Sequence, residues 1–156
     1  MKSALIIFNG LKFPYYVVEY ALAQIKQQNA SLHNLFLKAK KEISENYGFP
    51  SDLQVAEEIT NREDAQKDDM NIINDHIKLV TDMARSEGVA CTNKIITDCS
   101  LHEVLKLLNS FDSVYIDAGF DSESTSMLAN NKFKLSELIA RATVPVIVVA
   151  EDRSVS

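Results

Sequence analysis

The stretch DAGFDSESTSMLANNKFKLSELIARATVPVIVVA, residues 117–150, joins a glycine in a polar loop to a closing apolar run. Within it, KLSELIARA (134–142) predicts a short helix, and the β-branched run VPVIVVA (144–150) predicts a buried strand. Directly before the loop, FDSVYIDAG (111–119) predicts another strand. A strand, a loop, a helix and a second strand in this order indicate a parallel sheet. The question that the stretch raises is whether the loop after Gly119 holds a phosphate.

The same alternation of strands and helices extends back to the start of the chain. The apolar run ALIIF (4–8) predicts a strand that is buried on both faces and stops at the turn signal Asn9-Gly10. Ser100 and Glu103 have the spacing of a capping box at the start of a helix. The predicted elements are strand 4–8, helix 14–28, strand 31–39, helix 69–88, strand 89–98, helix 100–110, strand 111–119, helix 134–142 and strand 144–150.

One segment, residues 40–68, interrupts this alternation. It is the most charged and least periodic part of the chain, and Gly48 and Pro50 break any single helix, so we expect a surface insertion with a helical turn or more after Ser51. The whole chain, 1–156, is then one α/β domain of the Rossmann-like, doubly wound type, a five-stranded parallel sheet with helices on both faces. Ligands of such sheets bind outside the carboxyl ends of the strands, where the strand order reverses.

The composition indicates which classes of partner and which cellular compartment to expect. Sixteen basic and 22 acidic residues give a net charge of −6, and no basic run is long enough to neutralise a nucleic-acid backbone. No apolar run is long enough for a signal peptide or a membrane span, so we expect a cytoplasmic protein without a membrane partner. Cys91 and Cys99 form no CxxC motif and are expected to be reduced thiols.

The order of these elements resembles that of the universal stress protein family, over nearly the whole chain apart from residues 40–68. The similarity lies in an apolar first strand that ends at Asn9-Gly10, in FDSVYIDAG (111–119), and in the closing helix before VPVIVVA (144–150). The resemblance implies that the first and fourth strands lie side by side, so that Asn9-Gly10 and Gly119 flank one crevice. It also implies a regulatory or small-ligand-binding module in a stress response, and not an enzyme.

The loop departs from the pattern of the ATP-binding members that the chain resembles. Those members carry a glycine, two residues, a second glycine, nine residues, and a third glycine followed by Ser or Thr. The matching positions here are Gly119, Ser122, Lys132 and Phe133, so only the first glycine remains. Glycines let backbone N–H groups approach phosphate oxygens, and a phenylalanine ring donates no hydrogen bond. Asn9 also stands where such members usually carry an Asp.

These departures predict that ATP is not bound in the usual family mode and that no cofactor is needed. The alternative is ATP or AMP held by a divergent loop, in which Ser122 and Lys132 replace glycine contacts. The favoured interpretation of Lys132 is a solvated lysine in a polar run, and that of Phe133 is a core or hydrophobic-staple residue that enters the last helix and not a platform for adenine. The candidate ligand-binding residues are Asn9, Gly10, Lys38, Gly119, Ser122 and Lys132.

A second alternative is a small hydrolase or transferase that uses the strand-end crevice. Its candidates are Asp117, which has no obvious basic partner in the sequence, and Cys99, where a helix N-terminus would lower the thiol pKa. For Cys99 the favoured interpretation is an inert cysteine at a strand end beside a helix cap. Cys99 and His102 are spaced C-x-x-H, but zinc needs four ligands and the remaining candidates, Cys91, His33 and His76, are distant. The chain has no G-x-S-x-G, P-loop or G-x-G-x-x-G motif, so neither a catalytic residue nor a metal site is predicted.

The last strand has a second predicted role. If it lies at a sheet edge, its unpaired backbone groups and apolar side chains favour pairing with a copy across a two-fold axis. The chain after it, EDRSVS, is too short and polar to cover it. The family resemblance implies the same homodimer. Its predicted interface residues are Val144, Val146, Ile147, Val148 and Val149.

Overall fold

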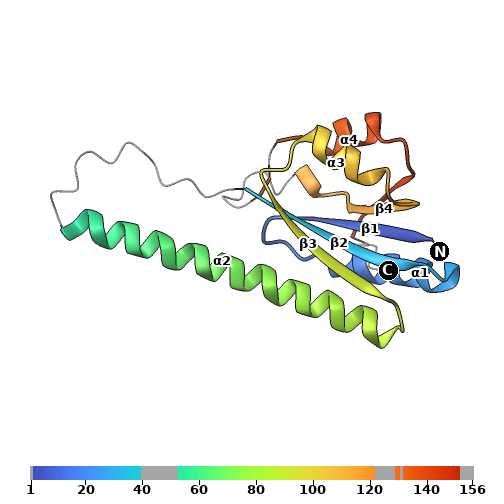
Figure 1. The fold of residues 1–156 in the computed structure, drawn as a ribbon, viewed down its shortest axis with the longest axis horizontal. Helices are drawn as coiled ribbons and strands as arrows, with labels where there is room; N and C mark the ends of the chain where they lie inside the picture. Colours follow the sequence, from blue (N-terminus) through green and yellow to red (C-terminus); the bar gives the residue numbers. More distant parts are fainter. Residues whose placement is uncertain (1, 40–52, 122–128, 131, 152–156) are drawn as a thin grey trace, which may run out of the picture.

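The computed structural model of the chain describes residues 2–39, 53–121, 129–130 and 132–151, and of residues 53–69 it describes only the backbone. Five parallel strands form one sheet in the order β3-β2-β1-β4-β5, with helices on both faces (Figure 1). Among the described residues, no helix is both long and apolar enough to cross a membrane. The elements are β1 (Ser3–Asn9), α1 (Tyr15–Gln28), β2 (Ser31–Lys38), α2 (Leu53–Ser86), β3 (Cys91–Thr97), α3 (Leu101–Leu108), β4 (Ser113–Asp117), α4 (Leu135–Arg141) and β5 (Val146–Val149).

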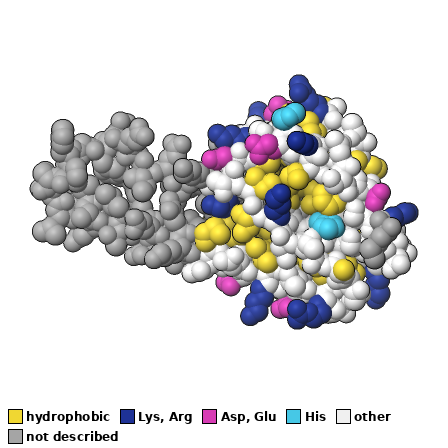
Figure 2. Space-filling model, viewed as in Figure 1, with side chains coloured by type: hydrophobic (Ala, Val, Ile, Leu, Met, Phe, Trp, Pro, Cys, Tyr) yellow, Lys and Arg dark blue, Asp and Glu magenta, His cyan; other side chains and the backbone are white. Residues whose placement is uncertain are grey.

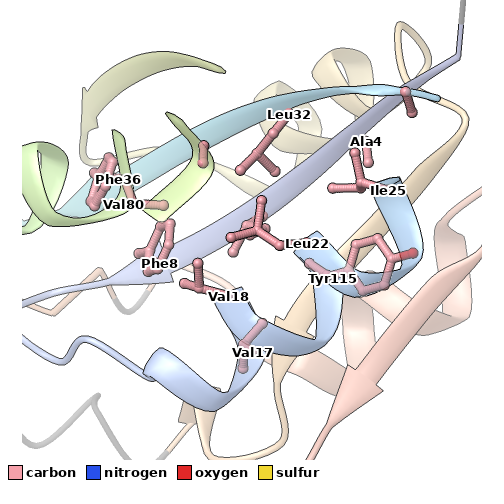
Figure 3. Packing of buried hydrophobic residues seen from close by; sticks show 14 of the residues in the cluster. Ala4, Phe8, Val17, Val18, Leu22, Ile25, Leu32, Phe36, Val80 and Tyr115 are labelled. Carbon is pink, nitrogen blue, oxygen red and sulfur yellow. The ribbon is translucent and has the colours of Figure 1, made fainter. Parts of the chain in front are cut away.

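The two faces of the sheet carry separate hydrophobic clusters. Parallel strands joined by right-handed crossovers place α1 and α2 on one face, because those two connections run outward from β1, and place α3 and α4 on the other. Along β1, Ile6 and Phe8 pack into the cluster under α1 and α2, part of which Figure 3 shows, whereas Leu5 and Ile7 pack into the cluster under α3 and α4. Because both faces of β1 are covered, its sequence is a continuous apolar run.

The sequence predicts the order and the kind of these elements correctly, and the doubly wound α/β fold is confirmed. The first and fourth strands do lie side by side, since Ile7 of β1 is in register with Ile116 of β4. The serine half of the predicted capping box of α3 is confirmed, because the Ser100 hydroxyl accepts a hydrogen bond from the Glu103 backbone N–H at 3.2 Å.

The predicted start of α2 is wrong. The sequence predicts a helix from Asp69 and, in the preceding insertion 40–68, a helical turn or more after Ser51, whereas one continuous helix of 34 residues begins at Leu53. The helical turn after Ser51 is therefore confirmed, but its separation from the helix at Asp69 is wrong. The first half of α2 extends beyond the sheet in Figure 1, so no sheet face demands an apolar stripe there. Periodicity therefore marks only the half that packs on the sheet, through Ile73, Val80 and Ala84. Residues 40–52 lie outside the described part of the chain.

A pair of neighbouring isoleucines tests which face of α2 packs on the sheet. Ile73 is 1% exposed within the cluster under α1 and α2, whereas Ile72 is 38% exposed. We expect Ile73→Ala to lower the free energy of unfolding by about 3 kcal/mol, because it leaves a cavity in a packed core. Ile72→Ala is the matched control, and its cost should stay below about 0.5 kcal/mol in urea unfolding. Equal losses for the two variants would contradict this orientation of α2.

Candidate functional site

The strand order reverses between β1 and β4, so the carboxyl ends of these two strands bound the predicted ligand crevice. Asn9 ends β1 and Asp117 ends β4, and each residue is only 5% exposed. Two polar side chains buried at strand ends require partners, since burial without hydrogen bonds is costly. Those partners determine what the crevice can hold.

Asn9 binds the backbone of the chain's own loop. Its Oδ1 accepts a hydrogen bond from the Asn130 backbone N–H at 2.7 Å, and its Nδ2 donates to the Asn130 backbone carbonyl at 3.1 Å. A carboxamide is suited to this exchange because it carries both a donor and acceptors, whereas an ionised Asp carboxylate only accepts. Asn9 therefore holds the loop against the end of β1.

Gly10 lets the same loop approach the end of β1 closely. Its φ of 66° lies in the left-handed region, and a Cβ added to it would lie 3.2 Å from the Ala129 Cα. Its backbone N–H donates to the Leu37 carbonyl at 2.9 Å. Glycine at this position therefore serves close packing against Ala129, and not an approach to phosphate alone.

The side chain of Asn130 fastens the loop to a third place. Its Nδ2 donates to the backbone carbonyl of Cys99, just beyond β3, at 2.9 Å, and the residue is 1% exposed. Asn130 thus links Cys99, in the connection between β3 and α3, with the end of β1. The segment Ala129–Asn130 lies over the carboxyl end of the central strand, at the place predicted for a ligand.

Asp117 has the basic partner that the sequence did not suggest. Its Oδ2 lies 2.8 Å from the Lys12 Nζ, and its Oδ1 accepts a hydrogen bond from the Tyr16 hydroxyl at 2.5 Å. Burial, followed by the hydrogen bond to this carboxylate, raises the pKa of Tyr16 to about 12. Tyr16 is therefore a neutral donor at physiological pH. Asp117 closes an ion pair and a hydrogen bond that fix the start of α1 against the end of β4.

The far end of the loop is anchored by packing. Phe133 is 4% exposed and stacks on Phe120 with ring centroids 5.5 Å apart, which confirms its prediction as a core residue. Asp121 Oδ1 accepts from the Leu135 backbone N–H at 2.8 Å, at the first residue of α4. Both contacts hold the beginning of α4 to the end of the β4 region.

The other predicted site residues are only partly brought together. Gly119 is half-buried two residues after Asp117, and Lys38 ends β2 beside β1, where its carbonyl accepts from the Asp98 N–H at 2.8 Å. Lys132 is exposed, next to the buried Phe133. Ser122 lies outside the described residues.

The cysteine candidate is a buried thiol. Cys99 is fully buried, and burial, with the nearby Glu103 carboxylate adding to it, raises the thiol pKa to about 11. The burial and the raised pKa agree with the favoured prediction of an inert cysteine beside a helix cap, and the depressed pKa considered as the alternative is wrong, because burial is the largest cause of the shift. In the part of the chain that is described, no three His, Cys, Asp or Glu side chains converge as a metal site would require.

Sequence reasoning missed Ala129 and Asn130 as site residues. The Asn9–Asn130 contact joins positions 121 residues apart, and no local pattern marks it. A signal for Lys12 and Tyr16 did exist. Once β1 and β4 are predicted as neighbours, the segment after β1 must pass the end of β4, where Asp117 needs a partner.

An isosteric change at Asn9 tests the contact with the loop. Asn9→Asp removes the donor to the Asn130 carbonyl and sets two acceptors against each other in a buried place, so we expect a loss of about 2 kcal/mol in unfolding free energy. The control is Asn74→Asp on the exposed face of α2, which should change stability by less than about 0.5 kcal/mol. Urea unfolding at pH 7 measures both, and an Asn9→Asp protein as stable as the parent would contradict the contact.

Similar solved structures support this fold independently of the sequence pattern. No protein-family model matches the sequence, and no curated protein matches it either. Among solved structures, the chain is similar to a universal stress protein family protein from Burkholderia pseudomallei, with 12% identity, a TM-score of 0.57 and coverage of 95% of both chains.

Two further similar structures contain nucleotides. One is a universal stress protein family protein from Arabidopsis thaliana with AMP bound, at 14% identity and a TM-score of 0.58, covering 98% of this chain and 94% of that one. The other is the universal stress protein from Archaeoglobus fulgidus in complex with dAMP, at 10% identity and a TM-score of 0.57, covering 95% and 97%. At such identities the likeness concerns the fold, and the chain has the fold of the universal stress proteins.

Proposed function

We propose that this chain is a cytoplasmic, universal-stress-protein-like regulatory or small-ligand-binding module that takes part in a stress response and does not hold ATP in the usual family mode. The proposal that ATP is not held in the usual mode rests on the pair of hydrogen bonds between the Asn9 side chain and the Asn130 backbone. The free thiols of Cys91 and Cys99 suit the reducing cytoplasm.

A triphosphate can bind at this crevice only if hydrogen-bond donors there are available. A triphosphate at this crevice needs backbone N–H groups aimed at its oxygens, which is what the family's glycines allow. Here the Asn130 N–H already donates to Asn9, and Ala129 packs against Gly10. The Lys12 ammonium, which could attract a phosphate, is paired with Asp117. Binding a triphosphate at this place would therefore first have to break buried hydrogen bonds.

A nucleotide-binding protein with a divergent loop is the second candidate. It is favoured by the similar structures that contain AMP and dAMP, and a monophosphate demands fewer donors than a triphosphate. Lys132 is exposed and could serve a phosphate as a point charge. A hydrolase or transferase has less support, because Cys99 is a buried thiol with a raised pKa and Asp117 is held by two partners.

Calorimetric titration distinguishes these candidates. We expect no heat of binding from ATP with magnesium at millimolar concentration, because the donors of the crevice are already paired. Micromolar ATP binding that is lost in Gly119→Val would contradict the proposal. AMP binding that weakens in Lys132→Ala, but not in the α3 control Lys106→Ala, would establish the second candidate instead.

We also propose that the module is a homodimer that pairs through β5. This strand is an edge of the sheet, because it pairs with β4 on one side and ends the strand order on the other. Val148 is 41% exposed, and Val144, Val146, Ile147 and Val149 are only partly buried. A second copy beside β5 would satisfy the free backbone groups and cover these side chains.

Light scattering coupled to size exclusion tests the dimer. We expect a mass of twice 17.4 kDa at tens of micromolar protein, and a shift toward 17.4 kDa in Val148→Lys, because each copy would then bury an ammonium at the seam. Leu79→Lys is the matched control, since Leu79 is also an exposed aliphatic residue (46%) but lies on α2. A parent protein that is monomeric under these conditions would contradict the proposal.

A further inference from the structure

A hollow of about 310 Å³ lies on the face of the sheet that carries α3 and α4. Its floor includes Leu5 of β1 and Leu35 of β2, and its wall includes Leu107 of α3 and Phe111. In Figure 2, hydrophobic side chains gather between the positions that β3 and α3 take in Figure 1, with basic and histidine side chains among them. This hollow plays no part in the function proposed above.

The hollow exists because one side of the sheet is incompletely covered. The helix α3 has only eight residues, and its Val104 and Leu108 are buried in the cluster that also contains Ile7 and Ile116. Those contacts place α3 over the middle of the sheet. The edge strand β3 is left with Thr92 and Lys94 exposed, beside the apolar side chains of the floor.

The aromatic part of the hollow is held rigidly. The His33 ring lies 5.0 Å from the Phe111 ring, and its two nitrogens contact the hydroxyls of Thr92 and Ser31. Burial lowers the pKa of His33, which favours the neutral imidazole. Two fixed aromatic rings at one end of an apolar floor form a surface on which a flat ring packs well.

One basic side chain lies at the rim of the hollow. Lys94 lines the hollow from β3 and is in register with Leu35. The ion pairs of the described residues leave its ammonium without a carboxylate partner. The Lys94 and Glu103 charges both act on the Cys99 thiol, but the lining of the hollow contains the lysine and no carboxylate. An apolar floor, two rings and one cation at the rim are complementary to a molecule that has an aromatic body and a single negative charge.

We propose that this hollow is a ligand site for a small aromatic carboxylate of about two fused rings. Its volume is roughly twice the ~150 Å³ of a cavity that accepts benzene. The ring system would pack on Leu5, Leu35 and Phe111, and the carboxylate would face Lys94. This site is independent of the strand-end crevice, because Leu5 precedes Asn9 by four residues of an extended strand, roughly 13 Å.

The probe for this proposal is 2-naphthoate, which is titrated into the full chain. Binding is measured by calorimetry and by the NMR chemical shifts of the backbone amides. Saturable binding is expected, with shifts centred on Thr92, Leu107 and Phe111. Thr92→Phe, which sets a ring into the hollow from an exposed position on an edge strand, should abolish these shifts. Lys94→Gln should weaken binding about threefold, as the loss of an exposed ion pair does, whereas Lys106→Gln should not change it.

A neutral analogue, 2-naphthalenemethanol, separates the charge from the ring. It should bind the parent protein about threefold more weakly than the carboxylate does, and bind Lys94→Gln and the parent equally. The proposal is overturned if the shifts lie outside this hollow, if Thr92→Phe binds 2-naphthoate like the parent, or if the carboxylate has no advantage over the alcohol. Whether a nucleotide binds at the strand ends does not affect these outcomes, so the two proposals can fail separately.

Discussion

The exchange of hydrogen bonds between the Asn9 side chain and the Asn130 backbone is the constraint on which the strand-end region depends. It joins the end of the central strand to a loop that is distant in sequence, and it does so out of contact with water, where each unpaired group would be costly. The close packing of Gly10 on Ala129 and the contact of Asn130 with Cys99 follow from this placement. A ligand at the usual place of this fold has to compete with the chain itself.

Periodicity and turn residues were enough to predict the elements and their order, because each strand and helix buries a definite face. The start of α2 was not predictable in this way, since its first half extends past the sheet and has no buried face to mark it (Figure 1). The contacts of Asn9 and Asp117 depend on residues that only the fold brings near. The sequence identified Asn9 and Asp117 as strand-end positions, but not Asn130, Lys12 or Tyr16 as their partners.

The same scaffold offers two chemically different places. At the strand ends, polar groups are paired with each other, through Asn9 with Asn130 and through Asp117 with Lys12 and Tyr16. On the face below α3, the short helix leaves part of β3 exposed, so that the Lys94 ammonium lies at the rim of a hollow with an apolar floor. The carboxyl ends of the central strands are therefore occupied by the chain's own loop, whereas the proposed ligand site lies on the face that carries α3 and α4.

Hydrogen exchange at the Asn130 backbone amide tests the central claim most directly. That N–H is buried and donates to Asn9 Oδ1, so the account predicts that it exchanges as slowly as the amides of β1 and only through larger opening events. Asn9→Ala should return the amide to rapid exchange while the amides of β1 stay protected. An Asn130 amide that exchanges at the rate of a solvated loop in the parent protein would contradict the account, because the end of β1 would then be open to a ligand.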